Sequence, residues 1–210
     1  VTVVIPFFIL AFYVFERMHW EQNFSKQRKI VFWVMIVLTL MGKEQLSLYI
    51  LMYGVFIALA RKNLRYGMYL MSLGIVWFVV SFMVIIPHYA KYRVDGFIEF
   101  SKELSIDQNL LEDVGKENYF LSRYSEFGDT YSAIALGIVL NPAKTTEVFF
   151  GGDKLTNFRM TMEPLLYTPL FAPFHLLISA PDFMINYLTT ESGIGTAEVY
   201  NHRVSMIVPV

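Results

Sequence analysis

Hydrophobic positions along this chain form long blocks separated by short polar segments. The clearest block runs from Tyr66 to Pro87 and contains no Asp, Glu, Lys or Arg. At about 1.5 Å rise per residue, a helix of this length spans roughly 33 Å, close to the roughly 30 Å of a bilayer's hydrocarbon core. A backbone that crosses hydrocarbon must satisfy its own hydrogen bonds, so residues 66–87 are predicted to form a transmembrane helix.

A second pair of apolar runs lies in residues 30–60, interrupted by Lys43 and Glu44. The flanking segments 16–29 and 61–65 are short and rich in Lys and Arg, which is typical of the cytoplasmic side of a membrane. One straight helix would place these segments on opposite sides and would bury two charges in hydrocarbon. The pattern therefore predicts a membrane hairpin with Lys43 and Glu44 at its far tip.

The remaining segments differ in character. Residues 1–15 are apolar and are predicted to end a span already under way. Residues 88–157 are richer in acids than in bases, with apolar residues at helical spacing, which predicts an extracytoplasmic layer of short amphipathic helices. Residues 158–210 are predicted to form a Pro-broken membrane hairpin and the start of a further span. Because the chain begins without Met and ends inside an apolar run, we expect an internal fragment of a longer protein.

Composition supports the same class of protein. Hydrophobic residues make up 55% of the 210 residues and charged residues 17%, whereas soluble domains have about 25% charged residues. The predicted fold class is thus all-α, a polytopic transmembrane helical bundle with the lipid bilayer as its partner. The absence of cysteine excludes disulfides and thiolate metal sites, and no basic patch indicates nucleic-acid binding.

Lys43 and Glu44 are the first candidates for chemistry. Ionisable groups at membrane depth are costly unless they are paired or face a cavity, and such residues are usually functional. The alternative is a loop tip at which both side chains reach headgroups or water.

A looser group of polar residues follows, placed mostly toward the outer face. Arginines there could clamp phosphate, and carboxylates could hold a divalent metal or act as a base. Each residue taken alone also has a structural explanation; Asp182, which follows Pro181, would suit a helix N-cap. The group consists of His88, Arg123, Tyr124, Glu163, His175, Asp182, Asn186, His202 and Arg203.

The order of several short motifs resembles a known family. They are Gly42-Lys43-Glu44, Ile85-Ile86-Pro87-His88-Tyr89, Arg123-Tyr124-Ser125-Glu126-Phe127-Gly128, Asn141-Pro142, Lys154-Leu155, Pro164-Leu165-Leu166, Thr168-Pro169-Leu170, Ala180-Pro181, Asn186-Tyr187-Leu188 and Tyr200-Asn201-His202-Arg203. The order of these motifs along the chain resembles that in an uncharacterised bacterial and archaeal family of polytopic membrane proteins, domain of unknown function 2079. That family is similar to the GT-C membrane glycosyltransferases.

The resemblance implies a multi-pass protein of a prokaryotic plasma membrane. It implies transfer of a sugar from a polyprenyl-phosphate carrier at the outer membrane face, with a divalent metal as the candidate cofactor. The residues it highlights are Lys43, Glu44, Tyr124, Gly128, Pro164, Asn186 and His202. Arg203 departs from the family pattern, which favours Tyr after the histidine, and the essential acid of GT-C enzymes is expected upstream of residue 1.

This resemblance leads to a specific hypothesis about roles. Lys43, Arg123 and Arg203 would contact phosphate, and Glu44 and Glu163 would orient the sugar or a metal. Two other classes stay open at this point. A transporter or flippase would bind its solute at broken helices and buried charges. A non-enzymatic membrane scaffold would leave Lys43 and Glu44 merely solvated.

Overall fold

A computed structural model of the chain describes residues 4–86, 88–89 and 123–189. Every regular element in these ranges is helical, which confirms the all-α class for this part of the chain. His202, Arg203 and the predicted start of a further span lie outside the described residues. The elements are α1 (Ile5–Trp20), α2 (Lys26–Leu40), α3 (Leu46–Ala60), α4 (Leu64–Val80) with the π-helical turn Ser81–Ile85, α7 (Tyr131–Leu140), α8 (Pro142–Phe150), α9 (Lys154–Met162), the 3₁₀ turns Glu163–Leu165 and Thr168–Phe171, and α10 (Pro173–Tyr187).

Helix starts follow local capping chemistry. The Ser25 hydroxyl accepts a hydrogen bond from the Arg28 amide at 3.4 Å, so α2 begins four residues before the apolar run at Ile30. Thr130 caps α7 in the same way, at 3.2 Å from the Ala133 amide. Each cap satisfies an amide that has no partner within the helix.

One of the described helices, Leu64–Ile85, is long and apolar enough to cross a membrane. The pair α7 and α8 passes the same test jointly but is bent by 97° between the two helices, so up to two such segments are present in the described ranges. Helices α1, α2, α3 and α10 have only 15 or 16 residues each. The predicted polytopic bundle therefore stays a prediction, and the predicted span 66–87 coincides with a helix, Leu64–Ile85, that has the length and composition of a membrane span.

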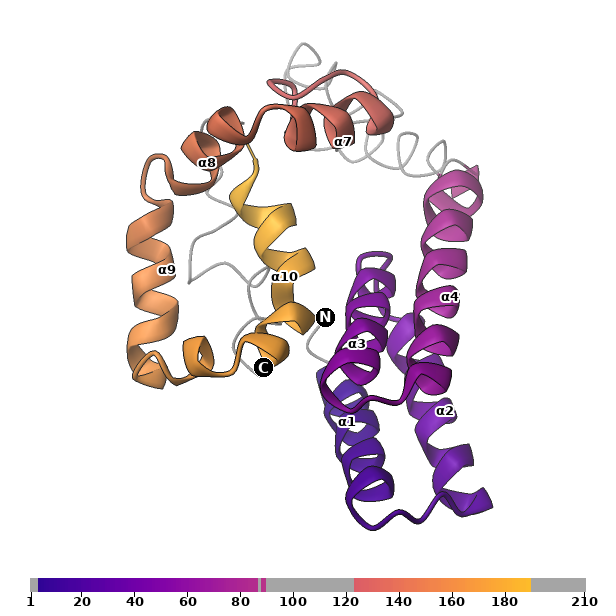
Figure 1. Ribbon diagram of the computed structural model, residues 1–210. Coiled ribbons are helices and arrows are strands. Elements are labelled where there is room, and N and C mark those ends of the chain that lie inside the picture. The colour runs from indigo at the N-terminus through magenta and orange to yellow at the C-terminus, as the bar shows by residue number, and fades with distance from the viewer. Residues whose placement is uncertain (1–3, 87, 90–122, 190–210) are drawn as a thin grey trace, which may run out of the picture.

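The main core lies between α1, α2, α3 and α4, and α10 adds Ile178 to it (Figure 1). Helix α3 packs most closely on α4, while α10 packs on another side of α3. The Tyr53 ring is fully buried, with ring centroids 5.5 Å from Phe8 and 6.3 Å from Phe15. Burying aromatic surface of this kind is the main energetic term that holds short helices together.

The two basic segments lie at the same end of this helical core. Arg61 Nε, after α3, donates to Glu16 Oε1 in α1 at 2.9 Å, and the guanidinium lies 5.8 Å from the Trp20 ring centroid. Because Lys43 and Glu44 connect α2 to the start of α3, their turn lies at the opposite end of α3. This arrangement is compatible with the topology expected from the basic loops.

The second half of the chain folds back on the first through α10. Helices α7 and α8 meet at Asn141-Pro142, where Pro142 occupies the first helical turn and its missing N–H costs no hydrogen bond. Figure 1 shows α8, α9 and α10 following one another around this half of the molecule.

The expectation that Asp182 caps a helix N-terminus is wrong. Helix α10 begins at Pro173 and runs through Pro181 and Asp182 without a break. A proline inside a helix removes one backbone hydrogen bond. Here the burial of the apolar residues Ile178 and Pro181 along the same helix offsets that loss, so the chain stays helical.

Candidate functional site

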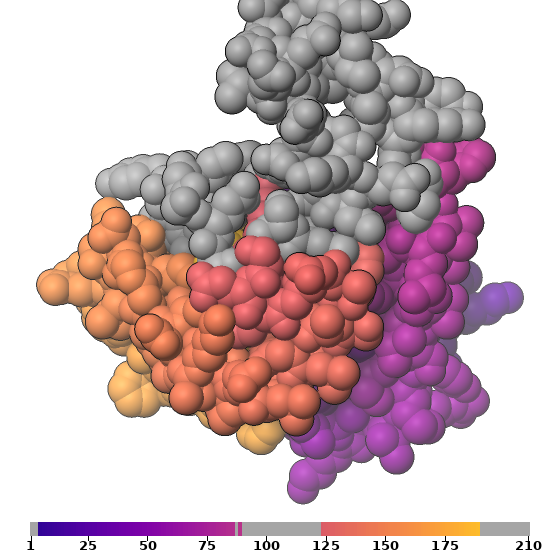
Figure 2. Space-filling view, turned by 90° about the horizontal axis from the view of Figure 1, so that it is seen from above, coloured from indigo at the N-terminus to yellow at the C-terminus, as the bar shows by residue number. Residues whose placement is uncertain are grey.

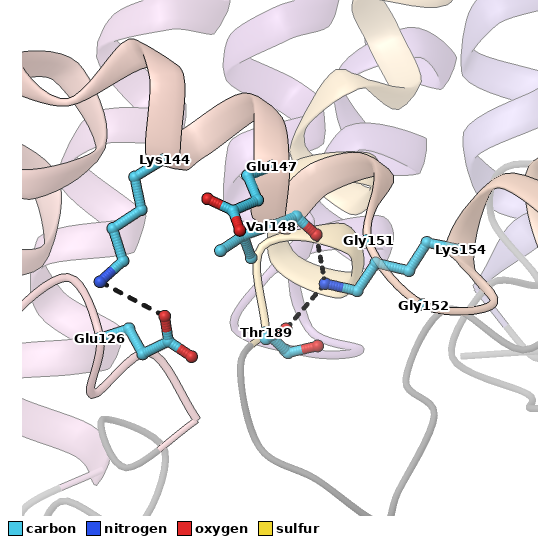
Figure 3. Close-up of a pocket in the computed structure, with 8 residues that line it drawn as sticks. All are labelled: Glu126, Lys144, Glu147, Val148, Gly151, Gly152, Lys154 and Thr189. Carbon is cyan, nitrogen blue, oxygen red and sulfur yellow. Dashed lines mark hydrogen bonds and ion pairs between the residues drawn. The ribbon is translucent and has the colours of Figure 1, made fainter.

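An open pocket of about 620 Å³ lies where the start of α9 approaches the end of α10. Its lining combines charged side chains with apolar surface and comes from the segment before α7, from α8, from the α8–α9 turn and from the end of α10 (Figure 3). The lining residues are Glu126, Lys144, Glu147, Val148, Gly151, Gly152, Lys154 and Thr189.

The charged side chains of the pocket differ in whether they form ion pairs. Lys144 Nζ lies 3.3 Å from Glu126 Oε2, and both side chains are about half exposed. Glu147 is exposed and makes no ion pair with any residue that the structure describes. Because carboxylates only accept hydrogen bonds, Glu126 and Glu147 make the pocket suited to a ligand that carries hydroxyl donors.

Lys154 closes one side of the pocket by a different route. Its ammonium donates to the carbonyl oxygens of Val148, Tyr187 and Thr189 at 2.7, 2.7 and 2.8 Å. The carbonyls at a helix C-terminus have no intrahelical partner and carry partial negative charge. Lys154 thus joins the ends of α8 and α10. Burial lowers the pKa of Lys154 below its ordinary value, with Glu126 acting in the opposite direction.

Replacing Lys154 with Met is expected to cost about 1–2 kcal/mol of unfolding free energy, because three carbonyls lose a charged donor at a partly solvated site. Hydrogen exchange should rise at the ends of α8 and α10 in particular. Lys144→Met is the matched control, since its ion pair with Glu126 is exposed and should contribute only about 0–1 kcal/mol. Equal effects of the two substitutions would contradict this role for Lys154.

An exposed apolar helix adjoins the pocket. Leu136, Val139 and Leu140 of α7 are 57%, 74% and 70% exposed, and α8, which lines the pocket, follows one residue later. In Figure 2, α7 and α8 form a continuous part of the face seen from above, next to α4. A polar pocket beside exposed apolar side chains can receive a ligand that has both a polar and an apolar part.

A second polar cluster is buried between α3 and α10. Asp182 and Tyr49 are both 0% exposed, and the Asp182 carboxyl has the Tyr49 hydroxyl and the Asn186 side chain as polar neighbours. The Lys43 ammonium also acts on this carboxyl electrostatically. This cluster brings Asn186 of the predicted site next to Asp182, and the charge of Lys43, another predicted residue, acts on it from the α2–α3 turn.

The other predicted residues are spread over the described structure. The Tyr124 hydroxyl donates to the Ile185 carbonyl of α10 at 2.7 Å, and Arg123 precedes it in the chain. Glu44 lies half-buried in the α2–α3 turn. Glu163 is exposed at the far end of α9 from Lys154, with its carboxylate 3.6 Å from Arg159. The structure therefore does not bring Glu163 to the pocket.

The His175 ring packs among aromatic side chains of the helical core. Its ring lies 4.9 Å from Phe56 and 6.2 Å from Phe12, measured between ring centroids. Within the described ranges, no three His, Asp or Glu side chains come together in a way that could hold a metal ion.

Sequence reasoning missed the parts that Glu147, Lys154 and Tyr49 play. Lys154 stood in a motif of the resemblance, but its three acceptors lie up to 35 residues away and leave no local pattern. Tyr49 lies within an apolar run, where an aromatic residue is usually a packing residue.

Comparison with known proteins assigns the sequence to a family. No curated protein and no solved structure matches the chain. The model of one family, described as predicted membrane protein (DUF2079), matches residues 1–210. The long apolar helix Leu64–Ile85 is consistent with that description. This chain, with its buried Asp182 cluster and its open polar pocket, therefore belongs to the DUF2079 family of predicted membrane proteins.

Proposed function

We propose that this protein is part of a membrane glycosyltransferase similar to the GT-C enzymes, which transfers a sugar from a polyprenyl-phosphate carrier at the outer membrane face. The observation that carries the proposal is the position of the polar pocket directly beside the exposed apolar helix α7. A lipid-linked sugar has the same two parts, a polar head and a long apolar chain.

The pocket supplies groups for the polar head. Sugar hydroxyls can donate to the carboxylates of Glu126 and Glu147, and each such bond to a charged acceptor is stronger than a neutral one. Lys144 can turn from Glu126 to a phosphate, because their ion pair is exposed and weak. The predicted phosphate contacts of Lys43, Arg123 and Arg203 and the predicted sugar contacts of Glu44 and Glu163 stay part of this proposal for the full-length protein.

The apolar chain of the carrier would lie against α7. Leu136, Val139 and Leu140 provide an exposed apolar surface, and the helix Leu64–Ile85 is long and apolar enough to cross the membrane. When the hydrocarbon chain of the ligand covers these side chains, both apolar surfaces leave water. The binding free energy gained is roughly 25 cal/mol per Å² of apolar surface buried.

The test is sugar transfer by the full-length protein in liposomes, with polyprenyl-phosphate sugars as donors. Glu147→Gln is expected to lower turnover about 10- to 100-fold, which is the factor for losing one hydrogen bond to a charged group. Asp129→Asn is the control, since Asp129 is exposed and does not line the pocket. If Glu147→Gln and Asp129→Asn give the same turnover as the unchanged protein, the pocket is not the sugar site.

A transporter is the second candidate, and a specific observation favours it. Pro181 removes one backbone hydrogen bond from the continuous helix α10 next to the fully buried Asp182, and transporters bind solutes at helices whose backbone hydrogen bonding is incomplete. This function would give solute flux into protein-containing liposomes without any sugar transfer. Sugar transfer without solute flux into the liposomes would instead support the glycosyltransferase.

A further inference from the structure

Asp182 is a buried acid without a completed hydrogen bond. It is 0% exposed where α10 packs on α3, and neither of its carboxylate oxygens has a hydrogen-bond partner of normal geometry. The neighbouring amide of Asn186 donates to the backbone carbonyl of Asp182 at 2.9 Å. The Tyr49 hydroxyl beside it is also buried and has no hydrogen bond of normal geometry.

Burial of an ionised carboxylate in this setting is costly. A buried charge without a partner costs several kcal/mol, whereas a neutral acid keeps one donor that a nearby oxygen can accept. Tyr49 from α3 and Asn186 from its own helix lie beside the Asp182 carboxyl, and Lys43 in the α2–α3 turn acts on it through its charge without contacting it. Of these, only Lys43 carries a charge, and its ammonium forms no ion pair with any of the described residues.

We propose that Asp182 is a proton-binding site, which keeps its proton while α10 packs on α3 and releases it when Lys43 moves into contact with the carboxylate. The proton passes from the acid to water, and the ammonium of Lys43 then balances the carboxylate. Lys43 is suited to this exchange because it lies half-buried in a short turn. Its long side chain can move without unfolding a helix.

Infrared spectroscopy of the full-length protein in lipid tests the site directly. The C=O stretch of a protonated carboxyl is separate from the bands of ionised carboxylates. We expect this band at neutral pH in the unchanged protein, its displacement on ¹³C labelling of aspartate side chains, and its loss in Asp182→Asn. Asparagine has the shape of the neutral acid, so this variant should keep its thermal unfolding midpoint. A spectrum without the band at neutral pH overturns the proposal.

The role of Lys43 has its own test. In Lys43→Met the band should persist to higher pH than in the unchanged protein, because the cation that stabilises the ionised form is gone. Lys62→Met is the matched control, since Lys62 is exposed at the opposite end of α3 and should leave the pH dependence unchanged. An identical pH dependence in both variants overturns the exchange with Lys43. Neither experiment measures sugar transfer, so the outcome is independent of the transferase proposal.

Discussion

Replacing Gly74 with Leu is expected to force α3 and α4 apart and to cost about 1–3 kcal/mol of unfolding free energy, or more. A Cβ atom at this position would lie 2.6 Å from the Ser47 carbonyl oxygen and 2.7 Å from the Leu51 amide nitrogen. Both atoms belong to the backbone of α3, which cannot move aside as a flexible side chain can. The two helices form the closest packing among the described elements, so the strain acts on the centre of the core.

Thermal unfolding of the purified protein in detergent measures this effect. Ser72→Leu is the matched control, because Ser72 lies two residues away on α4 and is exposed. The control adds a larger side chain to the same helix without meeting α3. If Gly74→Leu unfolds at the same temperature as Ser72→Leu, the close approach of α3 and α4 is not required for stability.

Replacing Arg61 with Ala should destabilise the end of the core that carries the basic segments, by about 1.5–3 kcal/mol. The Arg61 side chain is 19% exposed and that of Glu16 is 14% exposed, so the pair is largely removed from water. After the substitution, the Glu16 carboxylate retains the bond from the Trp20 indole nitrogen, at 3.1 Å, but has lost its positive partner. The guanidinium contact with the Phe56 ring, at 5.1 Å, is lost as well.

A double-mutant cycle separates these contributions. Glu16→Gln alone leaves Arg61 without its anion, and the double variant Glu16→Gln with Arg61→Ala removes both charges. We expect the double variant to be more stable than the sum of the two single effects implies, because neither charge is then left unpaired. Strictly additive effects would show that Glu16 and Arg61 do not interact.

Several features of this protein follow from local sequence alone. The block without charges from Tyr66 to Pro87 predicts a long apolar helix, and the structure contains one over Leu64–Ile85. Asn141-Pro142 marks the start of α8 for the same kind of reason, since proline suits a first helical turn. Such predictions work because hydrophobic runs, proline positions and caps act on residues that are close in the chain.

Other features depend on contacts between distant residues. Asp182 reads as a helix cap from its neighbours, but it lies buried inside α10 because that helix packs against α3. Lys154 belongs only to a short motif of the resemblance, and no local pattern indicates that it binds the carbonyls of Tyr187 and Thr189. The close approach at Gly74 likewise depends on where Ser47 and Leu51 lie.

The class of protein follows from the order of residues: an α-helical chain with at least one segment suited to a membrane, flanked by a basic segment. Which polar groups meet follows from helix packing. Packing places Asn186 beside Asp182, keeps Glu163 away from the pocket, and brings Glu126 beside Lys144. The physical reason is that helix formation depends on short-range hydrogen bonds and hydropathy, whereas the meeting of charges depends on how whole helices pack.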